Sequence, residues 1–246
     1  QSNENVKATF NMNMVNPTGT WGENDKTGWQ FVSSPITNSP LSAFVPSEGY
    51  YDLYKYDGTA SGAEWNNYKD GDFETEFISG RGYLASYEID TTATFKGVLN
   101  NASSFNTELS YYGDAYEMRF ANFYLLGNPF TFNMDWSNIS VENVYEAFAT
   151  VDPSTGGYVN SIKSGMTTIP VGDGFFVEAI GENPSISYNA RSKSRGEKVE
   201  YINVVASGKQ GSNNVIVKLS GKEERGFSKL ENLNQSIADL YVKNNG

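Results

Sequence analysis

An internal repeat constrains the fold of this chain more than any other feature of its sequence. The stretch WQFVSSPI (29–36) matches FYLLGNPF (123–130), so that Pro35 aligns with Pro129. Three further blocks match in the same order, with copies 92 to 95 residues apart: 50–68 with 145–161, 77–86 with 169–178, and 92–99 with 184–190. Four blocks in one order at nearly one spacing predict two copies of one structural unit.

Each block has the pattern of β-structure. Proline has no backbone N–H and cannot sit inside a hydrogen-bonded ladder, so Ser-Ser-Pro and Gly-Asn-Pro end the preceding strand at a fixed place. The middle block places Asp57 and Asp152 between aromatic strands, where an Asp side chain caps a tight turn. The glycines of Gly-x-Gly, at 80–82 and 172–174, permit a positive φ before the next strand.

The predicted fold is all-β, with two related β-sandwich or barrel-like repeats between an N-terminal strand and a C-terminal β tail. Residues 6–14 alternate in polarity and supply the N-terminal strand. We expect a first β module over 1–110 with its repeat core at 28–99, a second over 111–199 with its core at 122–190, and a C-terminal hairpin and tail over 200–246. The chain ends in Asn-Gly, a hairpin-turn signal, so we expect a returning strand beyond Gly246.

The composition excludes several classes of function. A net charge of −11 argues against nucleic acid as a partner, because phosphate binding needs clustered Lys and Arg. The chain has no Cys and no His, so it can build neither a Ser-His-Asp triad nor a His-ligated zinc site. We predict no cofactor and no metal site. No window reaches the roughly 20 apolar residues of a membrane span.

The first residue of the chain gives an expectation for the location of the protein. The chain begins with Gln rather than Met. We therefore expect that a signal peptide has been removed and that the protein is secreted or held at the cell surface.

The strongest candidate for ligand binding is an aromatic row in the first repeat. The stretch YYDLYKYD and the strand opposite it place four aromatic residues and one acid together: Tyr50, Asp52, Tyr54, Tyr56 and Trp65. Flat rings stack on the C–H faces of sugars and carboxylates accept hydroxyl hydrogen bonds, so this Tyr/Trp face suits a glycan. The alternative is a packed sheet face. The second repeat favours that alternative, because Ala149 and Val151 stand at two of these positions.

A row of acids supplies an alternative function. In KDGDFETEF, the acids at even positions share one face of an extended strand: Asp70, Asp72, Glu74 and Glu76. Paired carboxylates catalyse glycoside hydrolysis, so a carboxylate-dependent glycoside hydrolase-like enzyme around Asp72 and Glu74 is the alternative. A solvated strand face explains the same row. The acids could also hold Ca²⁺, although their spacing is not that of an EF-hand loop.

The repeated blocks resemble a family of large, repeat-built, secreted proteins of Bacteroidetes, which type IX secretion often exports. The modules of that family read roughly W-x-h-h-S-S-P, Y-D-L-Y-x-Y-D, W-x-N-Y, G-x-G-Y-L, T-F-x-G-x-L and W-x-L-L-G-N-P-F, where h is apolar. The matching stretches here lie at 29–35, 51–57, 65–68, 80–84, 94–99 and 123–130. The resemblance covers about residues 25–195 and implies a non-catalytic β region ahead of a sorting domain, with no catalytic residues.

The function predicted from these observations is that of a non-enzymatic extracellular or cell-surface module. Its role would be structural or adhesive. Its partners would be glycans, or cell-surface or matrix proteins, and the Tyr/Trp face of the first repeat would bind the glycan.

Overall fold

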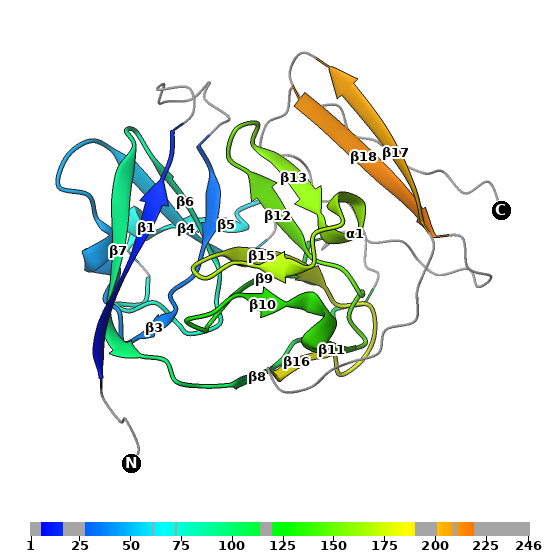
Figure 1. The fold of residues 1–246 in the computed structure, drawn as a ribbon, viewed down its shortest axis with the longest axis horizontal. Helices are drawn as coiled ribbons and strands as arrows, with labels where there is room; N and C mark the ends of the chain where they lie inside the picture. The colour runs from blue at the N-terminus through cyan, green and yellow to red at the C-terminus, as the bar shows by residue number, and fades with distance from the viewer. Residues whose placement is uncertain are drawn as a thin grey trace.

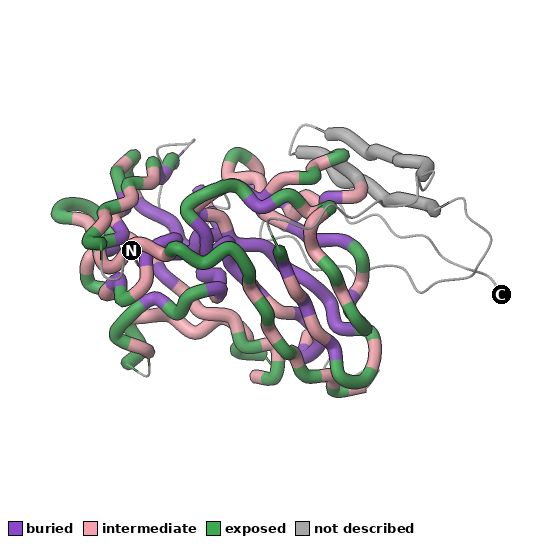
Figure 2. Tube along the Cα trace, turned by 60° about the horizontal axis from the view of Figure 1, so that its bottom comes forward, coloured by how far each residue is buried: buried purple, intermediate pink, exposed green. Residues whose placement is uncertain are grey.

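The chain is all-β, as its sequence predicts, and its sheets are antiparallel (Figure 1). The computed structural model describes residues 6–16, 28–60, 62–71, 73–113, 120–189, 201–208 and 211–218. Among these residues, no helix has the length and apolar character needed to cross a membrane. Figure 2 shows that the buried positions lie mainly toward the middle of the molecule and the exposed positions mainly toward its outside.

The first half of the molecule consists of two sheets around one core. The four-stranded sheet has the order β2-β6-β4-β5 and is formed by Gln30–Val32, Tyr83–Tyr87, Tyr51–Tyr56 and Trp65–Asn67. The three-stranded sheet has the order β1-β7-β3 and is formed by Lys7–Met14, Thr91–Leu99 and Ile36–Thr37. Two 3-10 turns, η1 (Leu41–Phe44) and η2 (Tyr68–Asp70), join these strands. Buried side chains from both sheets, Leu53 and Phe95 among them, form the core.

The second half has the same plan. Its four-stranded sheet has the order β13-β12-β15-β9, formed by Gly157–Asn160, Ala149–Asp152, Gly174–Glu178 and Phe123–Gly127. Its three-stranded sheet has the order β11-β16-β8, formed by Ile139–Glu142, Ser185–Asn189 and Ser104–Glu108. A short pair, β10 (Met134–Asp135) with β14 (Thr168–Ile169), the turn η4 (Trp136–Asn138) and helix α1 (Ser161–Ser164) complete it. The hairpin β17 (Tyr201–Gly208) and β18 (Gly211–Lys218) lies beside α1 and β13 (Figure 1).

Strands at matching sequence positions occupy matching places in the two four-stranded sheets. In the first half, β2 of the Pro-terminated block pairs with β6, the strand after Gly-x-Gly, and β6 pairs with β4 of the hairpin. In the second half, β9 pairs with β15 in the same way, and β15 pairs with β12 of the hairpin. Strand β8 pairs with β16, just as β1 pairs with β7. Strand β8 falls within the range predicted for the first module (1–110), and its ladder is formed with β16 of the second half.

The polar residue before each proline fixes the end of the strand. Ser34 Oγ accepts a hydrogen bond from the backbone N–H of Ile36 at 3.2 Å, and Asn128 Oδ1 accepts one from Phe130 at 2.9 Å. Such side-chain bonds to the backbone two residues ahead form a turn. Asp57 and Asp152 cap their turns in the same way, by accepting hydrogen bonds from the backbone N–H groups two residues ahead. These acids therefore have the turn-capping role that the sequence predicted.

Each Gly-x-Gly turn pairs with the Pro-terminated strand of the other half. Arg81 forms an antiparallel bridge with Leu126, and Asp173 forms the corresponding bridge with Val32. The Gly127 N–H donates to Gly80 O at 2.9 Å, and the Ser33 N–H donates to Gly172 O at 2.6 Å. The two halves thus exchange backbone hydrogen bonds reciprocally across their junction.

Close approach of aromatic rings explains why glycine stands in these turns. Gly80 has a φ of 80°, and a Cβ there would lie 2.3 Å from the Phe105 ring. Gly172 has a φ of 89°, and a Cβ there would lie 2.7 Å from the Phe10 ring. A side chain at either position would be strained by both its backbone and its neighbour. Phe10 and Phe105 lie in β1 and β8, so each ring covers the turn of the opposite half.

The two four-stranded sheets meet at a third core, which we call the junction cluster. Its buried members come from both halves: Phe31, Leu84, Phe123, Leu125, Ala149, Val151 and Phe176. Phe176 is fully buried and lies edge-on to Phe31, with ring centroids 5.2 Å apart. Burial of this apolar surface, together with the reciprocal bridges, holds the halves together as one packed body.

Candidate functional site

The predicted Tyr/Trp face is not an exposed platform, because most of it packs against the junction cluster. The Tyr56 ring centroid lies 4.7 Å from that of Phe176 and 5.0 Å from that of Trp65. Tyr54 packs edge-on against Trp29 at 5.8 Å. Burial, with smaller contributions from nearby Tyr and acidic groups, strongly raises the pKa of Tyr56. These rings therefore help to join the two halves and do not form a flat, fully exposed platform.

The other two predicted residues have different surroundings. Tyr50 is 67% exposed, and its backbone N–H donates to Glu88 at 2.9 Å. The Asp52 carboxylate accepts hydrogen bonds from Asn67 Nδ2 at 2.8 Å and from Lys69 Nζ at 3.1 Å. The five residues thus do not converge on one ligand surface. Leu53, on the opposite strand face, is fully buried in the core of the first half.

The start of the predicted row of acids is not an extended strand. Asp70 ends the 3-10 turn η2, and Gly71 follows with a φ of 108°. Asp72 lies outside the described residues. Glu74 instead binds the guanidinium of Arg81 at 2.7 Å and the ammonium of Lys55 at 3.5 Å.

The surroundings of Glu74 keep it ionised. Burial alone would raise its pKa, but a backbone hydrogen bond and the charges of Arg81 and Lys55 outweigh it and lower the pKa below the usual value. Its Oε1 also accepts a hydrogen bond from Tyr83 Oη at 3.2 Å. A carboxyl with a lowered pKa holds no proton to donate at neutral pH. Glu74 is thus suited to anchor the segment between β5 and β6.

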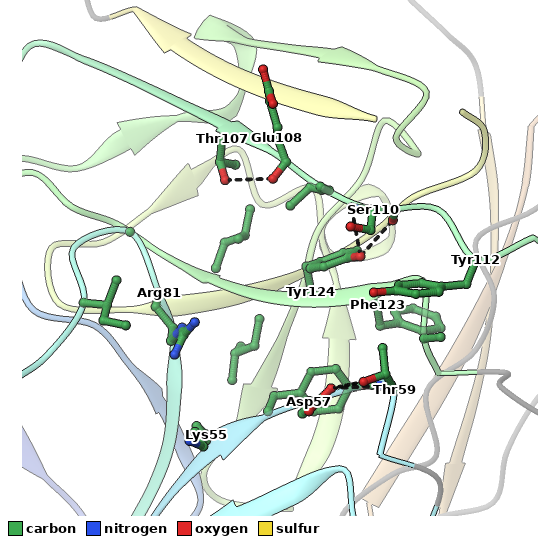
Figure 3. A pocket seen from close by; sticks show the side chains of 18 of the residues that line it. Lys55, Asp57, Thr59, Arg81, Thr107, Glu108, Ser110, Tyr112, Phe123 and Tyr124 are labelled. Atoms are coloured by element: carbon green, nitrogen blue, oxygen red, sulfur yellow. Dashed lines mark hydrogen bonds between the residues drawn. The ribbon is translucent and has the colours of Figure 1, made fainter. Parts of the chain in front are cut away.

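A groove lies where the halves meet, with a volume of about 500 Å³ (Figure 3). Strand β9 forms its floor. Its walls are the end of β4 with the following turn (55–59), the turn at 78–81, and β8 with the segment after it (105–110 and Tyr112). Its volume falls in the range of small-molecule sites, roughly 300 to 1,000 Å³.

Hydrogen bonds hold the outer wall of this groove against β9. Tyr124 Oη donates to the carbonyl of Ser110 at 2.8 Å and accepts from its N–H at 3.0 Å. The Asn122 amide accepts from the Tyr112 N–H at 2.9 Å and donates to the Gly113 carbonyl at 2.8 Å. The segment 110–113 is therefore fixed at both of its ends.

The opposite walls are fixed as well. Tyr56 Oη donates to the Phe120 carbonyl at 3.2 Å, and Gly58 lies so close to that carbonyl that a Cβ would be 2.0 Å from it. The turn at 78–81 is bound to β9 through the Arg81–Leu126 bridge. All three walls are thus attached either to β9 or to Phe120 shortly before it, and the groove is preorganised.

The lining combines cations, acids and aromatic rings. Lys55 and Arg81 lie toward one end, while Tyr112 and Tyr124 lie toward the other (Figure 3). Tyr112 is 43% exposed. Asp57 and Glu108 add two carboxylates to the lining.

The position equivalent to Arg81 in the second half holds a carboxyl, Asp173. Burial raises the pKa of Asp173 to about 7. Its backbone carbonyl accepts a hydrogen bond from the Asn128 N–H at 3.0 Å. The two halves thus differ in charge at the turns that join them.

The sequence analysis did not identify the groove residues as a site. They come from β4, β8, β9 and two turns, and no spacing in the sequence links them. One sequence signal bears on the groove: Phe10 and Phe105 lie 95 residues apart, at the spacing of the repeat, which indicates that β1 and β8 correspond. Within the parts of the chain that the structure describes, no group of three or more acidic residues is placed to hold a metal ion.

Searches against protein-family models, curated proteins and solved structures found no match.

Proposed function

We propose that this chain is a non-enzymatic extracellular or cell-surface module with an adhesive role, and that its partner is a glycan. The observation that carries the proposal is the preorganised groove at the junction of two tightly joined halves. A rigid β scaffold that presents a fixed groove suits recognition, because little conformational freedom is lost on binding.

We also infer that the halves arose by duplication, as the sequence blocks predict. The identical strand orders, the matched side-chain turns at Ser34 and Asn128, and the reciprocal bridges support this inference. In a duplicated pair, one half can hold the structure while the other gains a ligand site. The resemblance to secreted Bacteroidetes proteins, and the export it implies, remain part of the proposal.

A glycan array probed with the whole chain tests the proposed function. We expect binding of a limited set of glycans, and mass spectrometry of those glycans after long incubation should find them unchanged. Shortened glycans would contradict a non-enzymatic role and favour the hydrolase alternative. An array without any bound glycan would refute adhesion through glycans.

A further inference from the structure

We propose that the groove over β9 is the glycan site and that it binds a neutral oligosaccharide. Resting on the proposed function, this inference adds where the glycan binds and what kind it is. Tyr112 and Tyr124 would stack on sugar rings, and Arg81 would donate hydrogen bonds to sugar oxygens.

The rings are the first argument. A sugar presents C–H faces that pack on aromatic surfaces, and phenol rings also offer a hydroxyl at the edge. Tyr112 and Tyr124 both line the groove, and Tyr124 Oη fixes its own ring through Ser110. An exposed ring on a wall that is already anchored loses little entropy when a ligand covers it.

The polar lining is the second argument. The Arg81 side chain is 42% exposed although it binds Glu74, so part of it remains accessible to a ligand. Asp57 and Glu108 supply carboxylate acceptors on two other walls. Sugar hydroxyls both donate and accept, so they are matched by a lining that carries both kinds of group.

The charge balance selects among sugars. The lining holds two cations, Lys55 and Arg81, and two carboxylates, Asp57 and Glu108. A balanced lining gives no net attraction to a carboxylated or sulfated sugar, and the chain as a whole carries −11. The groove therefore favours an uncharged ligand over a nucleic acid or an acidic polysaccharide.

The test uses titration calorimetry of the whole chain with short neutral oligomers of glucose, mannose and galactose. Oligomers of uronic acids form a second arm. Tyr112→Ala and Arg81→Gln are the groove variants. Tyr50→Ala is the matched control, because Tyr50 is also an exposed tyrosine and belongs to the Tyr/Trp face. Circular dichroism verifies that each variant is folded.

We expect a neutral oligomer to bind the wild type, each groove variant to weaken binding at least about tenfold, and the control to leave it unchanged. Unchanged binding in both groove variants would overturn the groove as the site while the proposed function survives. Loss of binding in Tyr50→Ala alone would overturn the groove as the site and indicate the Tyr/Trp face instead. Binding of uronic acids only would overturn the neutral ligand. No binding in either arm would overturn the groove proposal, and only an empty glycan array would also refute the proposed function.

Discussion

Replacing Phe176 with alanine removes the ring at the centre of the junction cluster. This ring is fully buried and lies within 6.4 Å, centroid to centroid, of five other aromatic rings: Phe31, Tyr56, Trp65, Phe123 and Tyr158. Truncation of a buried Phe costs about 3 to 5 kcal/mol, because transfer energy is lost and a cavity remains. Both halves supply the neighbours, so neither half can close the cavity without moving relative to the other. We therefore expect a loss of about 4 kcal/mol in the free energy of unfolding.

The loss can be measured by urea unfolding followed by tryptophan fluorescence. For a chain of this size the melting temperature should fall by about 8 to 16 °C. Tyr50→Ala serves as the control, since truncation of an exposed side chain away from the core should change the free energy by less than about 0.5 kcal/mol. A loss below about 1 kcal/mol for Phe176→Ala would refute the argument that this cluster holds the halves together.

Three further perturbations test the turns between the halves. Asn128→Ala should destabilise the fold by about 2 to 4 kcal/mol in urea unfolding, because it leaves a buried N–H and three carbonyls without their amide partner; a neutral result would show that water replaces it. Gly80→Ala should lower the melting temperature more than Gly62→Ala, since both have positive φ but only Gly80 meets a ring; equal losses would contradict the steric argument. Burial raises the pKa of Asp173 from 3.8 to about 7, so the folded state favours its protonated form. The resulting contribution of Asp173 to the free energy of unfolding is complete below about pH 4 and is lost as the pH rises through 7. Urea unfolding at a series of pH values should show the free energy of unfolding of the wild type falling by up to about 4 kcal/mol relative to that of Asp173→Asn between those pH values. A difference between the two proteins that does not vary with pH would show that Asp173 does not titrate in this way.

The sequence by itself determined the β character and the local turns. Proline, the residue before it, and the turn acids act through bonds to residues one or two positions away. Asp57 caps the turn predicted for it, and Ser34 and Asn128 cap the turns that follow the strands ending at Pro35 and Pro129. Such effects are local, so the pattern of residues was enough to predict strands and the turns between them.

Only the tertiary structure decided what covers each strand face. Alternation along β4 shows that Tyr54 and Tyr56 share a face, but it does not say whether that face meets solvent or another sheet. The second half covers Tyr56 and leaves Tyr112 exposed over a groove. That outcome depends on how two distant segments pair, through Arg81 with Leu126 and Val32 with Asp173. A pairing between residues so far apart in the chain leaves no periodic signal in either segment, which is why the groove could be found only once the halves were seen together.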